Sequence, residues 1–458
     1  MKFLNPFRKN LFCAALIFGA FFCIPSAQAQ TPGNEPRTLK IERIEIQGNW
    51  KTKRGVILDY CVIVEEQALT QAELPDLLDE SWYHLTQTGF FQEVDLYPKP
   101  GAEKGGLIIV IEIKERRWPY FQFEGGHSDL NGWYLVPASL RFDNFLGRGN
   151  TGGFRLFFGE RVGKLMFNFR TEKLFDRSMF LDVTLESGAV NFIHKIDDDR
   201  VLQTVGVGGL KFRVGGNRGW FRHFFAGYTL LSYEPESDLK FFESRDPFPN
   251  ASFPQTLSSQ IGRRNFPSFE FGLQGDFRDN ALYPTKGFWG ALIFERFIDA
   301  DDRDFSFSKV TLDARYYQKL WKNHVLAVNL KSGNVEQNAP FYHRFYLGGA
   351  NSMRGVEERG LTPVGYGTEM VLTHVEYRFP FSSRRVLKSG SSVVLFADAG
   401  RVWLPNERQA EDELYSSVGF GLRFKLPIIG LTRLDVAFPG NMFEEQKAQF
   451  HFSLGHSF

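Results

Sequence analysis

The stretch from Lys164 to Arg170 reads KLMFNFR, and it alternates two kinds of side chain. Its odd positions carry Leu165, Phe167 and Phe169, whereas polar or charged side chains occupy three of the four even positions. A period of two is typical of a β-strand with one apolar and one polar face. An apolar face rich in large aromatic side chains favours a strand that faces lipid on one side and water on the other.

The same alternation returns in GFRLFFGE (153–160) and in AQFHFSLGHSF (448–458), and the chain holds 49 phenylalanines. Inside lipid, only helices and closed barrels satisfy the hydrogen bonds of their own backbone. The pattern therefore predicts an all-β transmembrane barrel. A soluble β-sandwich is the alternative, but it would need a large core to hide so many aromatic side chains.

The first residues predict export from the cytoplasm. Residues 1–29 combine a basic start, an apolar stretch over 11–24 and an A-x-A site at 27–29, which is the pattern of a cleaved signal peptide. A single membrane anchor is the alternative, and the short apolar stretch disfavours it. Residues 30–37 are expected to be a linker. After residue 30 no apolar run reaches about 18 residues, so we expect no transmembrane helix.

Removal of the signal peptide changes the cysteine count and the net charge. It leaves Cys61 alone, which excludes a disulfide framework within the mature chain. It also lowers Lys+Arg from 54 to 51 against 53 acidic residues, a net charge of 51 − 53 = −2. This balance offers no electrostatic case for binding nucleic acid.

Residues 38–117 predict one small α+β domain with the order β-α-α-β-β. Its second helix is expected to start at a capping box formed by Thr70 and Glu73, and to stop at Gly89. Pro75 is unfavourable in the first turns of a helix that starts at Thr70, and the sequence offers no compensation.

Residues 118–458 predict a barrel of about 16 antiparallel strands, an even number that closes without a free edge. The strands are expected to begin near residues 118, 133, 152, 164, 179, 203, 221, 267, 287, 305, 323, 366, 390, 414, 430 and 448. Short turns are expected at 147–150, 215–219 and 427–430 at one end of the barrel. Long loops are expected near 187–202, 233–266 and 334–365 at the other end.

One of these long loops contains GGANSMRGVEERG (348–360), which is charged and hinged by glycine. Two strands later, SSVVLFADAGRVW (391–403) carries a lone acid, Asp398, which should point into the lumen because facing lipid is costly. A buried carboxylate needs a cation, and Arg354 suits it because a guanidinium pairs with a carboxylate through two parallel bonds. Alternatively, Arg354 is a solvated residue of an outer loop.

Several motifs, in this order, resemble the BamA/TamA-like superfamily of outer-membrane assembly and translocation barrels. They are IERIEIQGN, TGFFQEVDLYP and LIIVIEIKE in the first domain, then NFLGRGN (144–150), DFRDNALYPTKG (276–287), MRGV (353–356), VEYRFP (375–380) and FADAG (396–400). The resemblance covers essentially the whole mature chain. It implies a single POTRA domain over 38–117 in the periplasm and an integral outer-membrane barrel over 118–458.

The resemblance also implies roles for particular residues. It implies that Arg354, Gly355 and Asp398 meet inside the lumen and lock the inserted loop, and that the terminal Phe458 belongs to a targeting signal. Val356 departs from the family, which usually has Phe or Tyr there. His456 departs as well, at a position that is usually hydrophobic.

The first and last strands predict a weak seam in the barrel. Pro119, Gly125 and Gly126 interrupt the first strand, and Gly455 interrupts the last. Proline removes a ladder bond and glycine weakens strand order. By the resemblance, the seam would open sideways so that a client strand pairs with it. The alternative is that these residues only accommodate the curvature of the barrel.

The expected function is the insertion of outer-membrane proteins, without an enzymatic step. Secretion of a dedicated partner is one alternative, and a passive pore or a lipid-handling barrel is another. No G-x-S-x-G, H-E-x-x-H or P-loop motif occurs, so we expect no catalytic, cofactor or metal residues. The acidic run DADDRD (299–304) is expected to be a solvated turn rather than a cation site. The expected partners are an unfolded protein client, membrane lipid and an accessory protein that docks on the POTRA domain.

Overall fold

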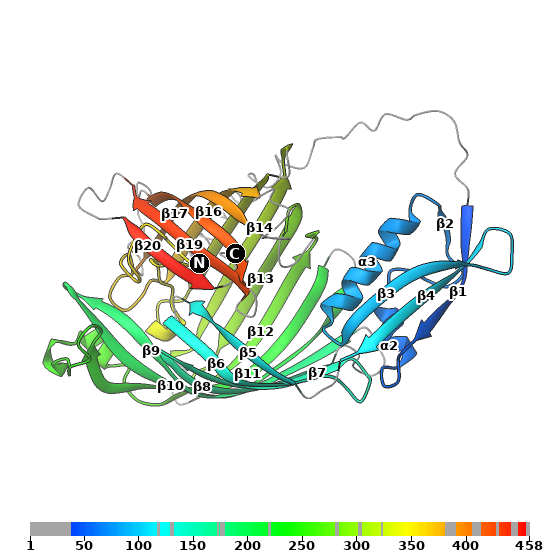
Figure 1. The fold of residues 1–458 in the computed structure, drawn as a ribbon. Helices are drawn as coiled ribbons and strands as arrows, with labels where there is room; N and C mark the ends of the chain where they lie inside the picture. Colours follow the sequence, from blue (N-terminus) through cyan, green and yellow to red (C-terminus); the bar gives the residue numbers. More distant parts are fainter. Residues whose placement is uncertain are drawn as a thin grey trace, which may run out of the picture.

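The fold is seen in a computed structural model of the chain (Figure 1). It describes residues 38–454 apart from 117–119, 129–131, 172–173, 175–178, 219–220, 280–283, 301–304, 322–323, 381–390, 405–413, 427–429 and 441–447. The predicted signal peptide and linker, and the predicted roles of Pro119, Gly455 and Phe458, lie outside the described residues. Among the described residues, no helix is both long and apolar enough to cross a membrane.

The N-terminal unit is a four-stranded sheet with two helices. Its elements are β1 (Thr38–Gln47), α2 (Arg54–Asp59), β2 (Ala68–Thr70), α3 (Leu74–Gln87), β3 (Phe91–Pro100) and β4 (Gly106–Glu115). The strand order is β2-β1-β4-β3, with β1 parallel to β4. The sequence missed β2, because three residues are too few to display a period of two. A core that includes Ile41, Ile57 and Leu85 joins the sheet to the helices.

Helix α3 begins later than the sequence predicted, and this resolves the problem of Pro75. Glu73 accepts hydrogen bonds from the backbone N–H and the hydroxyl of Thr70, at 2.8 and 2.9 Å, so the capping pair forms one turn before the helix. The helix then starts at Leu74 and places Pro75 within its first two positions. The missing N–H of proline costs nothing there.

The C-terminal unit is one sheet of sixteen strands, which confirms the predicted barrel. Each strand is antiparallel to the next. The strands are β5 (Tyr120–Ser128), β6 (Gly132–Phe145), β7 (Asn150–Gly159), β8 (Val162–Thr171), β9 (Met179–Ile196), β10 (Asp199–Arg218), β11 (Phe221–Phe241), β12 (Arg264–Asp276), β13 (Gly287–Phe297), β14 (Phe307–Lys319), β15 (Val325–Val335), β16 (Glu369–Pro380), β17 (Ser392–Trp403), β18 (Tyr415–Leu426), β19 (Gly430–Pro439) and β20 (Gln449–Leu454).

The two faces of this sheet are inverted relative to a soluble protein. On β12, Phe269 and Phe271 are 45% and 55% exposed, whereas Glu270 between them is buried. The stretch from Lys164 to Arg170 behaves the same way: Phe167 is exposed on the outer face, while Lys164 forms an ion pair with Glu186. Apolar residues therefore point outward and polar residues point into the lumen, as lipid outside and water inside require.

The predicted long loop near 187–202 is wrong. Residues 187–196 continue β9, and β10 starts at Asp199 after a tight turn. The connection after β11 is also shorter than predicted, because β11 runs to Phe241. Charged residues made these strand ends look like loops. The strand ends nonetheless keep an apolar face, because Val190, Phe192 and Ile196 alternate along β9 and pack in a buried cluster.

Candidate functional site: the lumen loop

The connection between β15 and β16 folds back into the barrel. We call its inner part, residues 347–362, the lumen loop. Its base is closed by hydrogen bonds between backbone atoms, from Phe345 N–H to Gly367 O (2.8 Å) and from Gly367 N–H to Phe345 O (2.9 Å). At its tip, Met353, Arg354 and Val356 are buried. An arginine can be buried only where its charge is compensated, so its partners define the site.

Arg354 binds two acids on neighbouring strands. Its Nε and Nη2 donate to Oδ2 and Oδ1 of Asp398 on β17, at 2.8 and 2.5 Å, in the bidentate geometry of a strong pair. Its Nη1 donates to Oε1 of Glu376 on β16 at 2.7 Å. The guanidinium also lies 3.6 Å from the ring centre of Phe396. The two residues that the sequence paired are thus in direct contact inside the barrel.

The acids of this pair belong to a larger buried network. Glu376 also accepts from Arg378 at 3.0 Å and from Arg423 at 3.3 Å. Arg423 in turn donates to Asp435 on β19 at 2.5 Å. The alternating charges form a continuous row along the inner face of β16 to β19. The row compensates each buried charge locally, so removing one member leaves another uncompensated.

Gly355 is required by space rather than by backbone conformation. Its N–H donates to Oγ of Ser417 on β18 at 3.2 Å. A Cβ at this position would lie 2.4 Å from Cβ of Ser417 and 3.0 Å from the carbonyl oxygen of Phe438. Any side chain would push the loop away from the wall. Val356, where the resembled family has an aromatic residue, packs in a buried cluster with Met353.

The opposite end of the lumen loop is held by the far wall of the barrel. Glu358 forms an ion pair with Arg161, and Glu357 lies 3.7 Å from the ammonium of Lys195 on β9. Just beyond the loop, the hydroxyl of Tyr366 donates to Ile193 O at 2.7 Å. The loop therefore crosses the lumen and is held by contacts to both walls.

The first and last strands of the barrel form an incomplete seam. β5 and β20 lie at the two ends of the sheet order, and over the described residues they share no ladder (Figure 1). Their nearest Cα atoms are within 8 Å. Trp133 lies on β6, next to β5, and reaches across the seam to Phe452 on β20. The two rings stack with their centres 5.4 Å apart. Gly125 and Gly126 pair with β6 on the other side of β5.

The lumen loop also reaches both strands of the seam. Nε2–H of His451 on β20 donates to Arg354 O at 2.6 Å. Nδ2 of Asn351 approaches His127 O on β5 at 3.4 Å. Arg433 on β19 holds the same segment through Ala350 O at 2.6 Å. The loop thus contacts the two edge strands that do not pair with each other.

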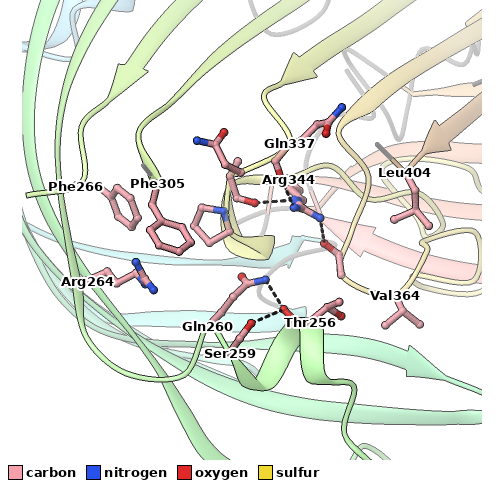
Figure 2. Close-up of a pocket in the computed structure, with 14 residues that line it drawn as sticks. Thr256, Ser259, Gln260, Arg264, Phe266, Phe305, Gln337, Arg344, Val364 and Leu404 are labelled. Carbon is pink, nitrogen blue, oxygen red and sulfur yellow. Dashed lines mark hydrogen bonds between the residues drawn. The ribbon is translucent and has the colours of Figure 1, made fainter. Parts of the chain in front are cut away.

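A cavity of about 550 Å³ lies beside the base of the lumen loop (Figure 2). It is lined by α4 (Gln255–Ser258) and the residues after it, and by residues 337–340 and 364–365. Arg344 braces this cavity by donating to Ala339 O at 2.7 Å and to Gln337 O at 2.6 Å. Beside the cavity, the connection after β11 also contacts the segment before the loop base, because the N–H of Phe341 donates to Oε1 of Gln260 at 2.9 Å.

The acidic run 299–304 is only partly described. Asp299 is buried and accepts from Arg264 at 3.0 Å, so it is not a solvated residue. Residues 301–304 lie outside the described part of the chain. Among the described residues, no group of three or more His, Cys, Asp or Glu side chains is placed to hold a metal ion.

Sequence reasoning found Arg354 and Asp398 but missed the rest of the network. Glu376, Arg423 and Asp435 each stand among apolar residues in a strand, as Asp398 does. That signal was available, and applied to every strand it would have predicted a row of lumen charges. The seam contacts of His451 and Asn351 carry no such signal, because they depend on where the loop is folded.

Comparisons with known proteins agree with this architecture. The Omp85 superfamily domain matches residues 144–458. An outer membrane protein assembly factor BamA of Nitratidesulfovibrio vulgaris is 25% identical over 449 residues, which cover 91% of this chain and 51% of the relative. This chain thus spans about half the length of that relative.

Two solved structures share the fold. The crystal structure of BamA from Haemophilus ducreyi lacking POTRA domains 1–3 has a TM-score of 0.61 at 17% identity, and the match covers 91% of this chain and 84% of that one. CdiB from Acinetobacter baumannii has a TM-score of 0.53 at 13% identity, over 92% and 74% of the two chains. At these identities the likeness concerns the fold alone.

Proposed function

This chain belongs to the Omp85 superfamily, and from that premise we propose that it inserts barrel proteins into the outer membrane through the seam between β5 and β20. The barrel is an integral protein of the cell outer membrane. Residues 1–29 would be the signal peptide, 30–37 a linker, 38–117 a single periplasmic POTRA domain and 118–458 the barrel. The proposed role needs no catalytic residue, cofactor or metal.

The seam is the observation that carries the proposal. An edge without a ladder partner presents free backbone groups, and an extended client strand can add to such an edge. Gly125 and Gly126 would weaken the order of β5 beside it. A passive pore is less well supported, because the lumen loop crosses the interior and is fastened to both walls.

Within this proposal, Arg354, Gly355 and Asp398 act as the lock that keeps the lumen loop in place. The POTRA domain would hold an unfolded client at its sheet edge, or dock an accessory protein. Phe458 would direct the chain itself to the outer membrane. Membrane lipid would receive the inserted client.

Secretion of a dedicated partner across the barrel is the second candidate function. It is favoured by the cavity of about 550 Å³ beside the base of the lumen loop, which leaves space next to the segments that flank the loop on both sides. If the lock released, a passage along the lumen would open. The two candidates differ in the route of the client, sideways through the seam or lengthwise through the lumen.

The test is a paired proteome after depletion of the protein. Cells complemented with wild type, Arg354→Ala or Arg296→Ala would be compared in their outer-membrane and secreted fractions. Arg296 is the matched control, because its ion pair with Glu336 at 3.3 Å is exposed at the rim. Breaking an exposed pair costs about 0–1 kcal/mol, against about 3–5 kcal/mol for one partner of a buried pair.

The outcomes separate the candidates. Loss of one or more barrel proteins from the membrane on depletion, not rescued by Arg354→Ala but rescued by Arg296→Ala, supports insertion. Loss of one secreted protein with an unchanged membrane supports secretion. No change in either fraction would reject both and leave a pore or a lipid-handling role.

A further inference from the structure

The N-terminal unit is joined to the barrel at the turn between β6 and β7. The N–H of Lys53 donates to Gly147 O at 3.0 Å, and Nδ2 of Asn144 donates to Oγ1 of Thr52 at 2.6 Å. Oδ1 of Asn144 accepts from the N–H of Gly149 at 2.9 Å, which also fixes the turn internally. The joint thus consists of hydrogen bonds between a loop of one unit and a turn of the other.

Close packing makes this joint tight. Gly147 has φ +68°, and a Cβ there would lie 2.1 Å from Lys51 O. From behind, the carboxylate of Glu115 on β4 accepts the backbone N–H groups of Lys51 and Thr52 at 3.2 and 2.6 Å. The segment around Lys51 is therefore held between β4 and the barrel turn.

Two large apolar side chains are exposed at the joint. Trp50 precedes Lys51 and is 74% exposed, and Leu146 precedes Gly147 and is 63% exposed. Two large apolar side chains this exposed, on two segments in mutual contact, make this joint a candidate interaction surface. Lys53 and Arg148, on the same two segments, are exposed as well. We call Trp50, Leu146, Lys53 and Arg148 the junction patch.

The patch lies close to the lipid-facing surface of the barrel. Phe154 on β7 is exposed on the outer face and stands five residues after Gly149, about 17 Å along the strand. Tilt shortens this distance along the membrane normal. Tryptophan and basic side chains at the end of an apolar belt are the arrangement that membrane–water interfaces select.

We propose that the junction patch binds anionic phospholipid headgroups in the leaflet on the N-terminal side of the barrel. Trp50 and Leu146 lie at the boundary of headgroups and acyl chains, and Lys53 and Arg148 contact the phosphates. The N-terminal unit then rests on the bilayer beside the barrel. This goes beyond the proposed function, because it holds whether clients are inserted or secreted.

The test is fluorescence quenching of the full chain in lipid nanodiscs. The discs contain phosphatidylglycerol and brominated phosphatidylcholine, whose brominated chains quench tryptophan fluorescence. The emission of Trp50 is obtained by subtracting the emission of Trp50→Phe from that of the wild type. Trp82 is the matched control, read from Trp82→Phe: it is 46% exposed on α3, and its indole N–H donates to Val94 O at 2.8 Å. We expect about a twofold loss of the Trp50 emission and none of the Trp82 emission.

The charges are tested with Lys53→Glu/Arg148→Glu. We expect quenching of Trp50 to be about twofold weaker in discs that contain phosphatidylglycerol and unchanged in discs of phosphatidylcholine alone. Trp50→Tyr provides a second reference should Trp50→Phe fail to fold, and heat-shifted mobility in gels reports the folded barrel.

Two results would overturn the proposal. Trp50 emission that is open to aqueous acrylamide and insensitive to brominated chains would place the patch in water. Trp50 that is shielded in native outer membranes but open in nanodiscs would assign the patch to a protein partner.

Discussion

The wall of β9 to β11 and the seam between β20 and β5 belong to one sheet but differ strongly in the extent of their strand pairing (Figure 1). β10 pairs with β9 through 18 consecutive residue pairs, whereas β20 pairs with β19 through six. β9, β10 and β11 are 18, 20 and 21 residues long, and β20 has six described as strand. Both regions nonetheless contact the same lumen loop.

The difference locates the weakest point of the barrel. Each ladder hydrogen bond contributes about 1 kcal/mol net, so opening the sheet between β9 and β10 has a large cost. Over the described residues, opening between β5 and β20 breaks no ladder bond. What resists it is side-chain contact, including His451 with the lumen loop and Trp133 with Phe452. Over the described residues, the seam is therefore held by side-chain contacts and by the lumen loop rather than by a backbone ladder.

The largest effect is expected from a covalent link across the seam. In a Cys61→Ser background, Trp133→Cys/Phe452→Cys would be joined with a short bismaleimide, and client folding measured in proteoliposomes. The control is Phe420→Cys/Val436→Cys, which joins direct partners on β18 and β19. We expect the seam link to abolish client folding and the control link to leave it intact.

Cys61 itself is a poor target for the reagent. Burial raises the pKa of its thiol to about 12, so little thiolate forms at neutral pH.

Activity that survives a complete seam link would break the comparison, since the seam would then have no part in the reaction.

A smaller effect is expected from disturbing the strong wall. Glu270 on β12 is buried and binds Lys211 at 2.9 Å and Arg213 at 2.7 Å on β10. Glu270→Gln removes the charge that compensates both, at a cost of about 1.5–3 kcal/mol. We expect a lower urea midpoint for the barrel in liposomes and unchanged client folding. Loss of client folding in a still-folded barrel would show that function is not confined to the seam side.

Gly355→Ala tests the lock without touching a charge. The added methyl meets Ser417 and the carbonyl of Phe438, and such overpacking costs about 1–3 kcal/mol. We expect the lumen loop to become sensitive to protease from the outside. Ser417→Gly in the same chain relieves one of the two clashes and should restore part of the protection. Equal sensitivity of single and double variants would argue against packing as the cause.

The smallest effect is expected from His451→Phe. It removes one hydrogen bond, to Arg354 O, which is worth about 0.5–1.5 kcal/mol. Amide hydrogen exchange should accelerate in β20 and remain unchanged in β10. Unchanged exchange in β20 would mean that the stacking of Phe452 on Trp133 alone holds the last strand.

The sequence predicted the barrel well because apolar and polar residues alternate along its strands. About sixteen strands were expected and, over the described residues, sixteen are found, since alternating apolar residues mark most of the outer faces. The strand ends at 187–202 were misread because the charged residues around the turn at 195–200 drew more weight than the alternation of Val190, Phe192 and Ile196. Arg354 and Asp398 could be paired because an isolated acid in an apolar strand demands a cation.

The rest of the site could not be predicted for a physical reason. Arg161, His127 and His451 touch the lumen loop only because it is folded across the lumen, and that path is a property of the closed barrel. Helix α3 shows the same on a smaller scale. Its start at Leu74 depends on where Glu73 finds its partner, rather than on the propensity of the segment alone.

The order along the chain of the residues that hold the lumen loop has a consequence for the synthesis of this protein. The partners of Glu358 and Glu357, Arg161 and Lys195, precede the lumen loop in the chain. The hydrogen-bond partners of Arg354 and Gly355 on the barrel wall follow the loop, from Glu376 through Asp398 and Ser417 to His451, which stands 97 residues beyond Arg354. A chain cut short before β20 lacks one of these contacts. The hydrogen bond from His451 to the loop tip therefore forms only after β20 has been synthesised.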